Sequence, residues 1–297
     1  MICVKVPATT ANFGAGFDSL GAALDYYNRI WMEEWDGCWI EILDDTDVPT
    51  DETNLIYQTA KALYERCGRP FRGLHIRQEN RIPTARGLGS SSACIAGGLL
   101  GANELLGRPC ELAQLVDLAA AMEGHPDNST PALLGGFVVS AYDEGHVYSL
   151  KKTIAPGITF AAFIPDFKLL TEKARAALPK MVSHADAVYN LSRAALLATA
   201  FCEERYDFLP VAAKDSLHQQ YRLPLIEGGE AVFALADGLG ALATFISGAG
   251  PTILSVVRTA EANVFFERAQ AALESDEELA HFTLHRFVAD NEGAKVV

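Results

Sequence analysis

A glycine- and serine-rich turn that runs directly into an apolar helical repeat limits the local fold of this chain more than any other segment. Pro83–Ala93 reads Pro-Thr-Ala-Arg-Gly-Leu-Gly-Ser-Ser-Ser-Ala, and Ile95, Leu99, Ala102 and Leu106 follow at helical spacing. Glycines let consecutive backbone N–H groups converge, and a helix N-terminus carries a partial positive charge. The segment therefore predicts a phosphate-binding loop, and a simple serine-capped helix is the alternative.

The residues on either side of the helix start support the phosphate interpretation. Each serine of Ser90–Ser92 can cap the helix, hydrogen-bond a phosphate oxygen or place a hydroxyl on Mg²⁺. The helix itself contains Gly97, Gly98 and Gly101, each of which costs about 1 kcal/mol relative to alanine. Such a glycine face predicts that a strand or the nucleotide approaches this helix closely.

The charge balance explains why such a loop is needed. The 297 residues contain 24 Lys and Arg against 38 Asp and Glu, a net charge of −14, so the surface as a whole repels phosphate backbones and general nucleic-acid binding is excluded. An anionic ligand must be bound locally, by backbone N–H groups or a few arginines. The chain has no GxxxxGK[ST] P-loop, no GxGxxG after an early βαβ unit and no GxSxG elbow.

The chain shows no sign of a membrane span or of a disulfide framework. Gly238–Val257 carries no charge, but Ser247–Thr252 at its middle is a turn, so we expect two short strands there rather than a span. The six cysteines are widely spaced without a CxxC pair, and the opening residues Met1–Val6 are expected to form a strand rather than part of a signal peptide. We expect reduced cysteines, with Cys94 and Cys202 as small core residues, in a cytoplasmic protein.

Hydrophobic periodicity predicts a mixture of strands and helices, which is an α+β fold. The expected strands are Ile2–Val6, Trp39–Leu43, Leu74–Gln78, Gly136–Ala141, Thr159–Ile164, Ala243–Ile246, Ile253–Val257 and Thr283–Val288. Besides the glycine-rich helix, three helical stripes are expected: Ile56, Ala60, Leu63 and Cys67, capped by Asp51 or Thr53; Val188, Leu191, Ala195, Ala198 and Cys202; and Ala262, Phe265, Phe266, Ala269 and Leu273.

Three ordered motifs resemble those of the GHMP kinases. Pro83–Ala93 is similar to the nucleotide-binding motif PxxxGLGSSxA, Val6–Asp18 to the N-terminal motif of the family and Ser247–Thr252 to its C-terminal motif. The resemblance implies a two-lobe fold. Residues 1–150 would form an ATP-binding lobe similar to domain 2 of ribosomal protein S5, and residues 151–297 would form a ferredoxin-like α/β sandwich.

Within that family the chain most resembles the branch that phosphorylates homoserine. The opening Pro-Ala-Thr-x-Ala-Asn-x-Gly-x-Gly-Phe-Asp is typical of that branch, and the block from Glu123 to Phe137 resembles its EG-H-DN-x-x-PA-x-x-GGF pattern, although Ser129 and Thr130 replace Val-Ala. The resemblance implies transfer of a phosphoryl group from ATP, with Mg²⁺, to the side-chain hydroxyl of L-homoserine in threonine biosynthesis. A homodimer is possible on the same grounds.

The resemblance also implies roles for individual residues. The nucleotide site would consist of Pro83, Thr84, Ala85, Arg86, Gly87, Leu88, Gly89, Ser90, Ser91, Ser92, Ala93 and Asn54. The amino-acid site would consist of Asn12, Asp18, His125, Asn128, Thr171, Arg175, Arg222 and Gly248. Ser91 and Glu123 would bind Mg²⁺, and Ser91, Glu123, Asn128 and Arg175 would act in catalysis. The chemistry fits, because a substrate carboxylate favours an arginine fork and an ammonium favours a carboxylate such as Asp18.

Several alternatives remain open at this point. Asp127 could be a catalytic base, whereas with neutral Asn128 near the acceptor the proton would pass to a phosphate oxygen or to water. Alternatively, the sole role of Asp18 could be to cap a helix that begins at Ser19. The chain could also be another kinase of the family, such as one for mevalonate, or a ligand sensor without activity. A hydrolase built on Ser91 and His125 lacks an orienting partner at motif spacing.

Overall fold

The computed structural model describes all 297 residues, which form eleven strands and ten α-helices. The strands are β1 (Ile2–Ala11), β2 (Leu20–Glu34), β3 (Gly37–Ile42), β4 (Gly73–Glu79), β5 (Phe137–Asp143), β6 (His146–Lys152), β7 (Ile158–Pro165), β8 (Ala243–Ile246), β9 (Ile253–Arg258), β10 (Phe282–Phe287) and β11 (Lys295–Val296). The helices are α1 (Leu55–Arg66), α2 (Ser90–Leu105), α3 (Leu112–Glu123), α4 (Ser129–Leu134), α5 (Thr171–Ala176), α6 (His184–Cys202), α7 (Leu209–Ala212), α8 (Gln219–Arg222), α9 (Gly229–Gly238) and α10 (Ala262–Ser275).

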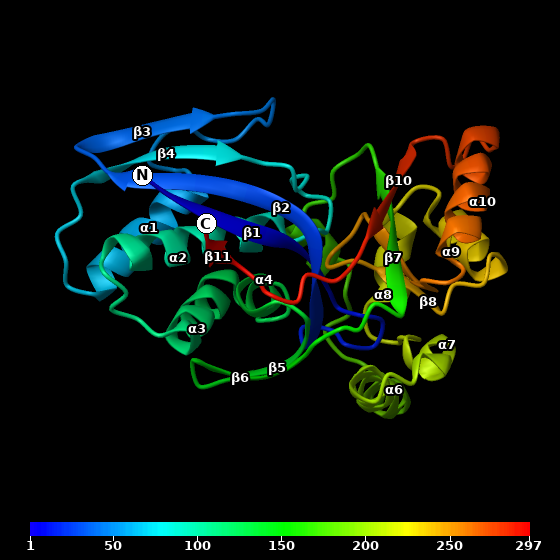
Figure 1. The fold of residues 1–297 in the computed structure, drawn as a ribbon. Helices are drawn as coiled ribbons and strands as arrows, with labels where there is room; N and C mark the ends of the chain where they lie inside the picture. Colours follow the sequence, from blue (N-terminus) through cyan, green and yellow to red (C-terminus); the bar gives the residue numbers. More distant parts are fainter.

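The strands form two separate sheets. The first has the order β11-β1-β2-β4-β3, with the β5–β6 hairpin paired to β2, and the second has the order β10-β7-β9-β8. Helices α1 to α4 lie together against the first sheet, and α9 and α10 lie beside the second (Figure 1). Strands β1 to β6 belong to the first sheet and β7 to β10 to the second, whereas the last strand, β11, pairs with β1 of the first sheet. A domain division at residues 150 and 151 stays a prediction.

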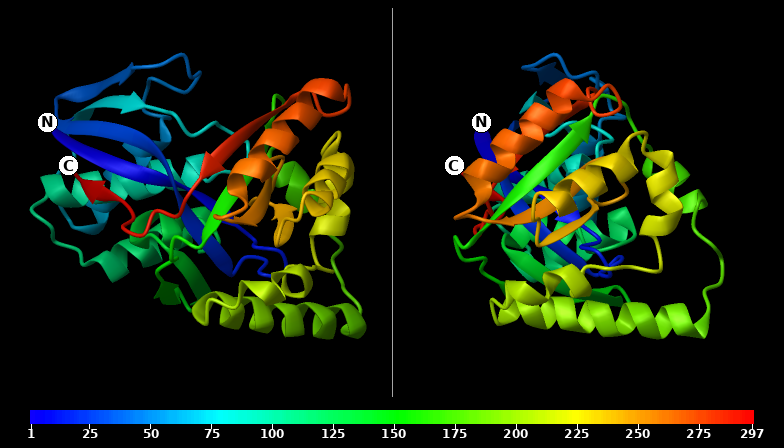
Figure 2. Two further views of the ribbon diagram at one scale, coloured as in Figure 1. Left: turned by 45° about the vertical axis from the view of Figure 1, so that its right-hand side comes forward. Right: turned by 90° about the vertical axis from the view of Figure 1, so that its right-hand side faces the viewer.

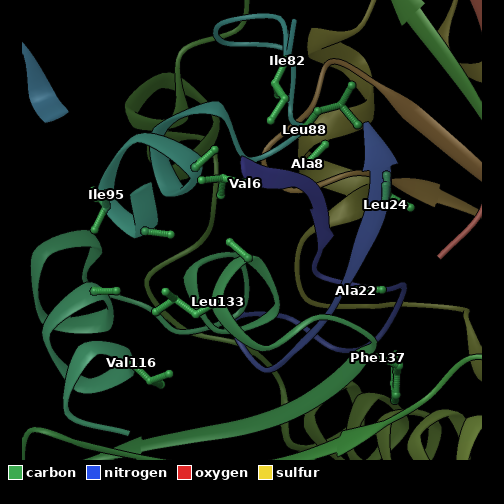
Figure 3. Close-up of a cluster of buried hydrophobic side chains, with 14 of the residues drawn as sticks. Val6, Ala8, Ala22, Leu24, Ile82, Leu88, Ile95, Val116, Leu133 and Phe137 are labelled. Carbon is green, nitrogen blue, oxygen red and sulfur yellow. The ribbon is translucent and has the colours of Figure 1, made fainter. Parts of the chain in front are cut away.

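The glycines of α2 allow this helix to lie directly on β2. A Cβ atom at Gly97 would stand 2.3 Å from Cδ1 of Ile30, and one at Gly101 would stand 2.3 Å from Sδ of Met32. The expected close approach at this helix is therefore made by a strand. Figure 3 shows the core around this helix, with Val6 of β1 among its side chains. The packing fixes the position of α2, whose N-terminus opens toward the functional residues described below.

Strand β7 joins the two halves of the molecule because each of its faces packs in a different core. Phe160 and Ala162 belong to the large cluster shared with the first sheet, whereas Ala161 and Phe163 belong to a smaller cluster with α9 and α10. This alternation follows from the two-residue period of a strand. Phe13 sits at the junction and contacts the aromatic rings of Phe137, Phe160, Phe201 and Phe245.

Replacing Phe13 by alanine should destabilise the whole molecule. The ring is almost fully buried among four other aromatic rings, and phenylalanine-to-alanine changes in cores cost about 3–5 kcal/mol. Denaturant unfolding measures the loss, with Phe208→Ala as the matched control, because Phe208 is 40% exposed and its removal should cost less. Equal losses for the two variants would contradict the junction role of Phe13.

Most of the expected elements are present, including β8 and β9 on either side of the Ser247–Thr252 turn. None of the helices is both long enough and apolar enough to span a bilayer. The expected stripe of α10 is confirmed, since Ala262, Phe265, Ala269 and Leu273 are buried. In the stripe of α1, Ile56, Ala60 and Leu63 are buried, whereas Cys67 is half-buried just beyond the helix. The N-cap of α1 is Asn54 rather than Asp51 or Thr53.

The structure contradicts further interpretations of the sequence. The chain after Asp18 is the long strand β2 rather than a helix starting at Ser19, because β1, β4 and β5 all pair with it. The expected core stripe of α6 faces outward, with Val188 51% and Leu191 71% exposed, and Cys202 is exposed as well. The buried face of α6 instead carries Asn190, Leu197, Ala200 and Phe201. Figure 2 shows α6 along the outer edge of the molecule.

Candidate active site

The three sequence motifs, which are far apart in the chain, meet at one cleft. The Asn12 side chain donates from Nδ2 to the carbonyl oxygen of Gly248 at 2.8 Å. The Ser247 hydroxyl lies 2.6 Å from the carbonyl oxygen of Gly87 and 2.8 Å from the Thr10 hydroxyl. Residues of the N-terminal, glycine-rich and C-terminal motifs are thus bonded to one another, and this contact network forms the floor of the site.

The cleft has a volume of about 350 Å³ and collects residues from both halves of the molecule. Its walls are Asn12, Leu55, Ala85, Arg86, Gly87, Gly89, Ser90, Ser91, Ser92, Ile95, Met122, Glu123, His125, Asn128, Leu169, Thr171, Arg175, Arg222, Gly248, Ala249 and Gly250. All but one of the residues expected in the amino-acid site are among them, the exception being Asp18. The structure therefore brings the two sets of expected residues together.

The glycine-rich loop presents backbone rather than side chains at the start of α2. Gly87 and Gly89 both have positive φ, 78° and 69°, and Gly89 is the N-cap residue of α2. A Cβ atom at Gly89 would stand 1.9 Å from the Thr9 hydroxyl, and one at Gly87 would stand 2.3 Å from the carbonyl oxygen of Ser247. No other residue fits at either position. The positive end of a sixteen-residue helix consequently opens into the cleft.

Not every residue of the expected nucleotide segment faces the cleft. Leu88 and Ala93 are completely buried in the hydrophobic core, where Figure 3 shows Leu88 near Ala8. Pro83 is outside the cleft lining. The guanidinium of Arg86 donates to the carbonyl oxygens of Pro165 and Asp166, at 3.0 and 2.5 Å. Arg86 therefore ties the loop to the end of β7.

A smaller hollow of about 220 Å³ adjoins the cleft and shares Leu55, Ala85, Ser90 and Ser91 with it. Thr84 and Asn54 line this hollow. The Asn54 amide is committed to the fold, because its Oδ1 accepts from the N–H groups of Ile56 and Tyr57 and its Nδ2 donates to Pro49. Asn54 therefore shapes the hollow chiefly by capping α1.

Glu123, the last residue of α3, is a buried carboxylate at the cleft. It accepts a 2.5 Å hydrogen bond from the Ser92 hydroxyl, and its other oxygen, Oε2, is buried without a hydrogen-bond partner. Burial raises the pKa of Glu123 to about 7, despite the opposing effects of His125 and Ser92. The serine that contacts Glu123 is thus Ser92, whereas Ser91 lines the cleft.

His125 and Asp127 form a buried pair beside Glu123. His125 Nδ1 lies 2.6 Å from Asp127 Oδ1, and the second oxygen of Asp127 is buried without a partner. Burial by itself lowers the pKa of His125, but the Asp127 carboxylate outweighs that effect and the net shift is upward. His125 lines the cleft and Asp127 does not. Asp127 therefore acts on the site through His125.

Asp18 and Arg175 form an ion pair at the edge of the cleft, where Arg175 lines it and Asp18 does not. The Arg175 guanidinium donates two hydrogen bonds to the Asp18 carboxylate, at 2.7 and 3.1 Å. Thr171 and Arg175 are four apart on α5, as their spacing predicts, and both line the cleft. The two groups expected to meet a substrate ammonium and a substrate carboxylate thus satisfy each other in this structure.

Arg222 is a fully buried arginine without a carboxylate partner. Its side chain donates to the carbonyl oxygens of Gly248 and Ala174, at 3.2 and 3.4 Å, and lies over the ring of Phe17. Burial, followed by the charge of Arg175, lowers the pKa of Arg222 to about 10. A buried guanidinium bonded only to carbonyl groups is poised to accept an anion.

Two further residues position the site, and sequence reasoning did not single them out. The Thr9 hydroxyl donates to Asn128 Oδ1 at 2.7 Å, which leaves the amide N–H groups of Asn128 as donors toward the cleft. Phe17 provides the ring that both Arg175 and Arg222 cover. Both residues lie in the N-terminal motif, so the motif itself was the available signal.

Comparisons with known proteins identify the family of the chain. Residues 54–136 match the model of the GHMP kinases N terminal domain. The chain is 44% identical to the homoserine kinase of Caldicellulosiruptor saccharolyticus over 100% of this chain and 96% of that one, and 46% identical to the homoserine kinase of Clostridium beijerinckii over 86% of each.

Solved structures show the same fold. The crystal structure of homoserine kinase from Cytophaga hutchinsonii superposes with a TM-score of 0.88 at 26% identity, covering 100% of this chain and 97% of that one. A mevalonate kinase superposes with a TM-score of 0.73 at 12% identity, over 98% of this chain and 100% of that one, which shows a common fold and no more. With its motifs joined at one cleft and its full length matched, the chain belongs to the homoserine kinases of the GHMP kinase family.

Proposed function

We propose that the chain transfers the γ-phosphoryl group of ATP to the side-chain hydroxyl of L-homoserine and yields O-phospho-L-homoserine and ADP. The observation that carries this proposal is a single cleft with a helix N-terminus at one side and the unpaired cation of Arg222 at the other. The first feature suits a polyphosphate and the second suits the carboxylate of an amino acid. The names of the full-length relatives support the same reaction.

ATP would bind with its phosphates at the glycine-rich loop. The N–H groups at the start of α2 and the hydroxyls of Ser90 and Ser91 supply donors in a protein that carries an overall charge of −14. The adjoining hollow, shaped by Asn54 and Thr84, is the proposed place for the adenosine end, because it is continuous with the cleft through Leu55 and Ala85.

Glu123 and a serine hydroxyl are suitable ligands for Mg²⁺. Mg²⁺ in kinases is bound by one or two carboxylates, substrate phosphates and water, and the unpartnered Oε2 of Glu123 at the cleft is a free ligand of that kind. We propose Ser91 as the hydroxyl, since Ser92 is already bonded to Glu123. When bound, the ion would neutralise charge on the phosphates.

Homoserine would bind between the two arginines and Asn128. Its carboxylate would pair with Arg222 and Arg175, and its ammonium would pair with Asp18. Asn12, His125, Thr171 and Gly248 would complete the pocket. When the homoserine zwitterion binds, the ion pair between Asp18 and Arg175 would be replaced by one between Asp18 and the ammonium and one between Arg175 and the carboxylate. No charge would therefore lose its partner.

The transfer step needs positioning more than a base. Asn128, fixed by Thr9, would orient the homoserine hydroxyl toward the γ-phosphorus, and Arg175 would stabilise charge on the transferred group. The oxygen attacks phosphorus, the bond to the ADP oxygen breaks, and the hydroxyl proton leaves to a phosphate oxygen or to water. Asp127 is an unsuitable base, because it bonds His125 and does not line the cleft.

The dependence of activity on Mg²⁺ should vary with pH around 7. Glu123 has its pKa raised to about 7, so below that pH it carries a proton and loses the charge that binds the ion. We expect the Mg²⁺ activation constant to rise roughly tenfold per pH unit below 7 and to level off above it. Glu123→Gln should show only the pH dependence of Mg–ATP itself. A wild-type profile identical to that of the variant would refute the metal role.

An ADP-release assay across homoserine, serine, threonine and mevalonate tests the proposed substrate. We expect homoserine to give the fastest ADP release and mevalonate to give none above the rate without acceptor, because mevalonate has no ammonium for Asp18. Fast release with mevalonate alone would instead favour the second candidate, another small-molecule kinase of the family. Thermal stabilisation by homoserine but not by mevalonate would support the same assignment independently of turnover.

Two broader expectations accompany this function. We propose that the protein acts in the cytoplasm, where ATP and free amino acids meet. A homodimer stays a prediction, which sedimentation of the purified protein would test.

A further inference from the structure

Two of the six cysteines face each other at the outer ends of helices α1 and α3. Cys67 directly follows α1, and Cys110 precedes α3 by two residues. Their sulfur atoms lie 3.9 Å apart, and no other two cysteines are within hydrogen-bonding range of each other. The kinase chemistry proposed above uses neither residue, so this pair calls for a separate explanation.

The folded framework holds both cysteines in place. The backbone N–H of Cys67 donates to the Leu63 carbonyl at 3.0 Å, which continues the hydrogen bonding of α1. The backbone of Cys110 is bonded twice by the buried Asn103 amide: its N–H donates to Asn103 Oδ1 at 3.0 Å, and its carbonyl accepts from Asn103 Nδ2 at 2.9 Å. The two sulfurs are thus held near each other because α1 fixes the backbone of Cys67 and Asn103 of α2 fixes the backbone of Cys110.

We propose that Cys67 and Cys110 are a modification site at which a reversible disulfide forms by exchange with a small disulfide such as oxidised glutathione. A protein disulfide has its sulfurs about 2.05 Å apart, so the two sulfurs, 3.9 Å apart in this structure, must approach by roughly 2 Å for the bond to form. Both residues are partly exposed, so a small disulfide can reach them.

The exchange balances in two steps. One cysteine thiolate attacks a sulfur of oxidised glutathione, which forms a mixed disulfide and releases one glutathione thiolate. The second cysteine, after losing its proton to solvent, attacks the protein sulfur of that mixed disulfide and releases the second glutathione thiolate. The two protein thiols are thereby oxidised by two electrons, and one glutathione disulfide is reduced to two thiols.

The environment of Cys110 predicts how the exchange responds to pH. Burial raises the pKa of Cys110, the hydrogen bond with Cys67 adds to this shift, and the charge of Arg66 opposes it. Because the thiolate is the attacking species, disulfide formation should accelerate as the pH rises above neutrality.

The disulfide should stabilise the fold without blocking the cleft. It would close a loop between residues 43 apart in sequence, which restricts the unfolded chain. Cys67 and the cleft residue Leu55 lie at opposite ends of α1, and Cys110 and the cleft residue Glu123 lie at opposite ends of α3. Each helix has twelve residues, so each pair is separated by about 18 Å along the helix axis. We therefore expect a higher melting temperature at nearly unchanged turnover.

The test uses the full chain carrying Cys202→Ser, which removes the exposed thiol and leaves five cysteines. After equilibration with oxidised glutathione at pH 8, we expect three titratable thiols in denaturant, a peptide linking Cys67 to Cys110 and a melting temperature raised by roughly 5–10 °C. Dithiothreitol should reverse all three changes. Adding Cys67→Ser, or Cys110→Ser in its place, should abolish the melting shift.

Three results would overturn the proposal. They are five titratable thiols after the treatment, a linked peptide that contains other cysteines, and glutathione adducts on Cys67 or Cys110 without a bond between them. The thiol count and the peptide map come from a protein with both cysteines intact, so they decide the matter even if a serine variant at either position folds poorly.

Discussion

Glu123→Gln should lower turnover by roughly 10²- to 10³-fold while leaving the fold intact. Glutamine keeps the size of the side chain and can still accept the Ser92 hydrogen bond, so the change removes little but the charge that would bind Mg²⁺. Removing one positioned electrostatic group from an active site typically lowers kcat by a factor of this size. Steady-state kinetics at several Mg²⁺ concentrations measure the effect.

The matched control for this variant is Glu65→Gln. Glu65 lies exposed on α1 and lines neither the cleft nor the adjoining hollow, so its replacement should leave turnover within about twofold of the parent. Ser91→Ala should fall between the two, because a hydroxyl ligand contributes less than a charge. Near-normal turnover of Glu123→Gln at low Mg²⁺ would contradict the metal role of Glu123.

Arg222→Lys should raise the KM for homoserine by roughly 10- to 100-fold and leave the KM for ATP unchanged. Lysine keeps the positive charge but cannot form the fork with which a guanidinium grips a carboxylate, and a hydrogen bond to a charged group is worth about 1.5–3 kcal/mol. Arg222 is 1% exposed, so water cannot replace the missing donors. The assay varies each substrate separately at saturation of the other.

The control for this second variant is Arg205→Lys. Arg205 pairs with Asp207 at the exposed surface, where ion pairs contribute little, and its replacement should change neither KM. A thermal melt of Arg222→Lys distinguishes a weakened site from a misfolded protein. If instead the affinity for ATP collapses while homoserine binding persists, Arg222 belongs to the nucleotide side and the proposed division of the cleft is wrong.

The motifs predicted the site better than the periodicity predicted the fold. The resemblance to the GHMP kinases implied roles for Gly89, Glu123 and Arg222 at one site, and the structure places all three at the cleft. What sequence could not show was their pairing. The bond from Ser92 to Glu123 and the Asp18–Arg175 ion pair depend on backbone positions that are set by distant elements.

Two errors of the sequence-based predictions have identifiable physical reasons. The run Leu20-Gly-Ala-Ala-Leu24 at the start of β2 lacks alternation because both faces of the strand are buried there. One of its two pairing partners, β5, comes much later in the sequence. In α6 the periodicity correctly indicated a helix, but the apolar stripe through Val188 and Leu191 faces solvent. A period identifies a helix without stating which face the rest of the molecule covers.

The most direct measurement is a crystal structure of the chain with Mg²⁺, a non-hydrolysable ATP analogue and homoserine. We expect a triphosphate along Gly87–Ser92, a metal ion on Glu123, and the amino acid with its carboxylate on Arg222 and its hydroxyl at Asn128. A nucleotide seated elsewhere, with the N-terminus of α2 free of phosphate, would contradict this expectation.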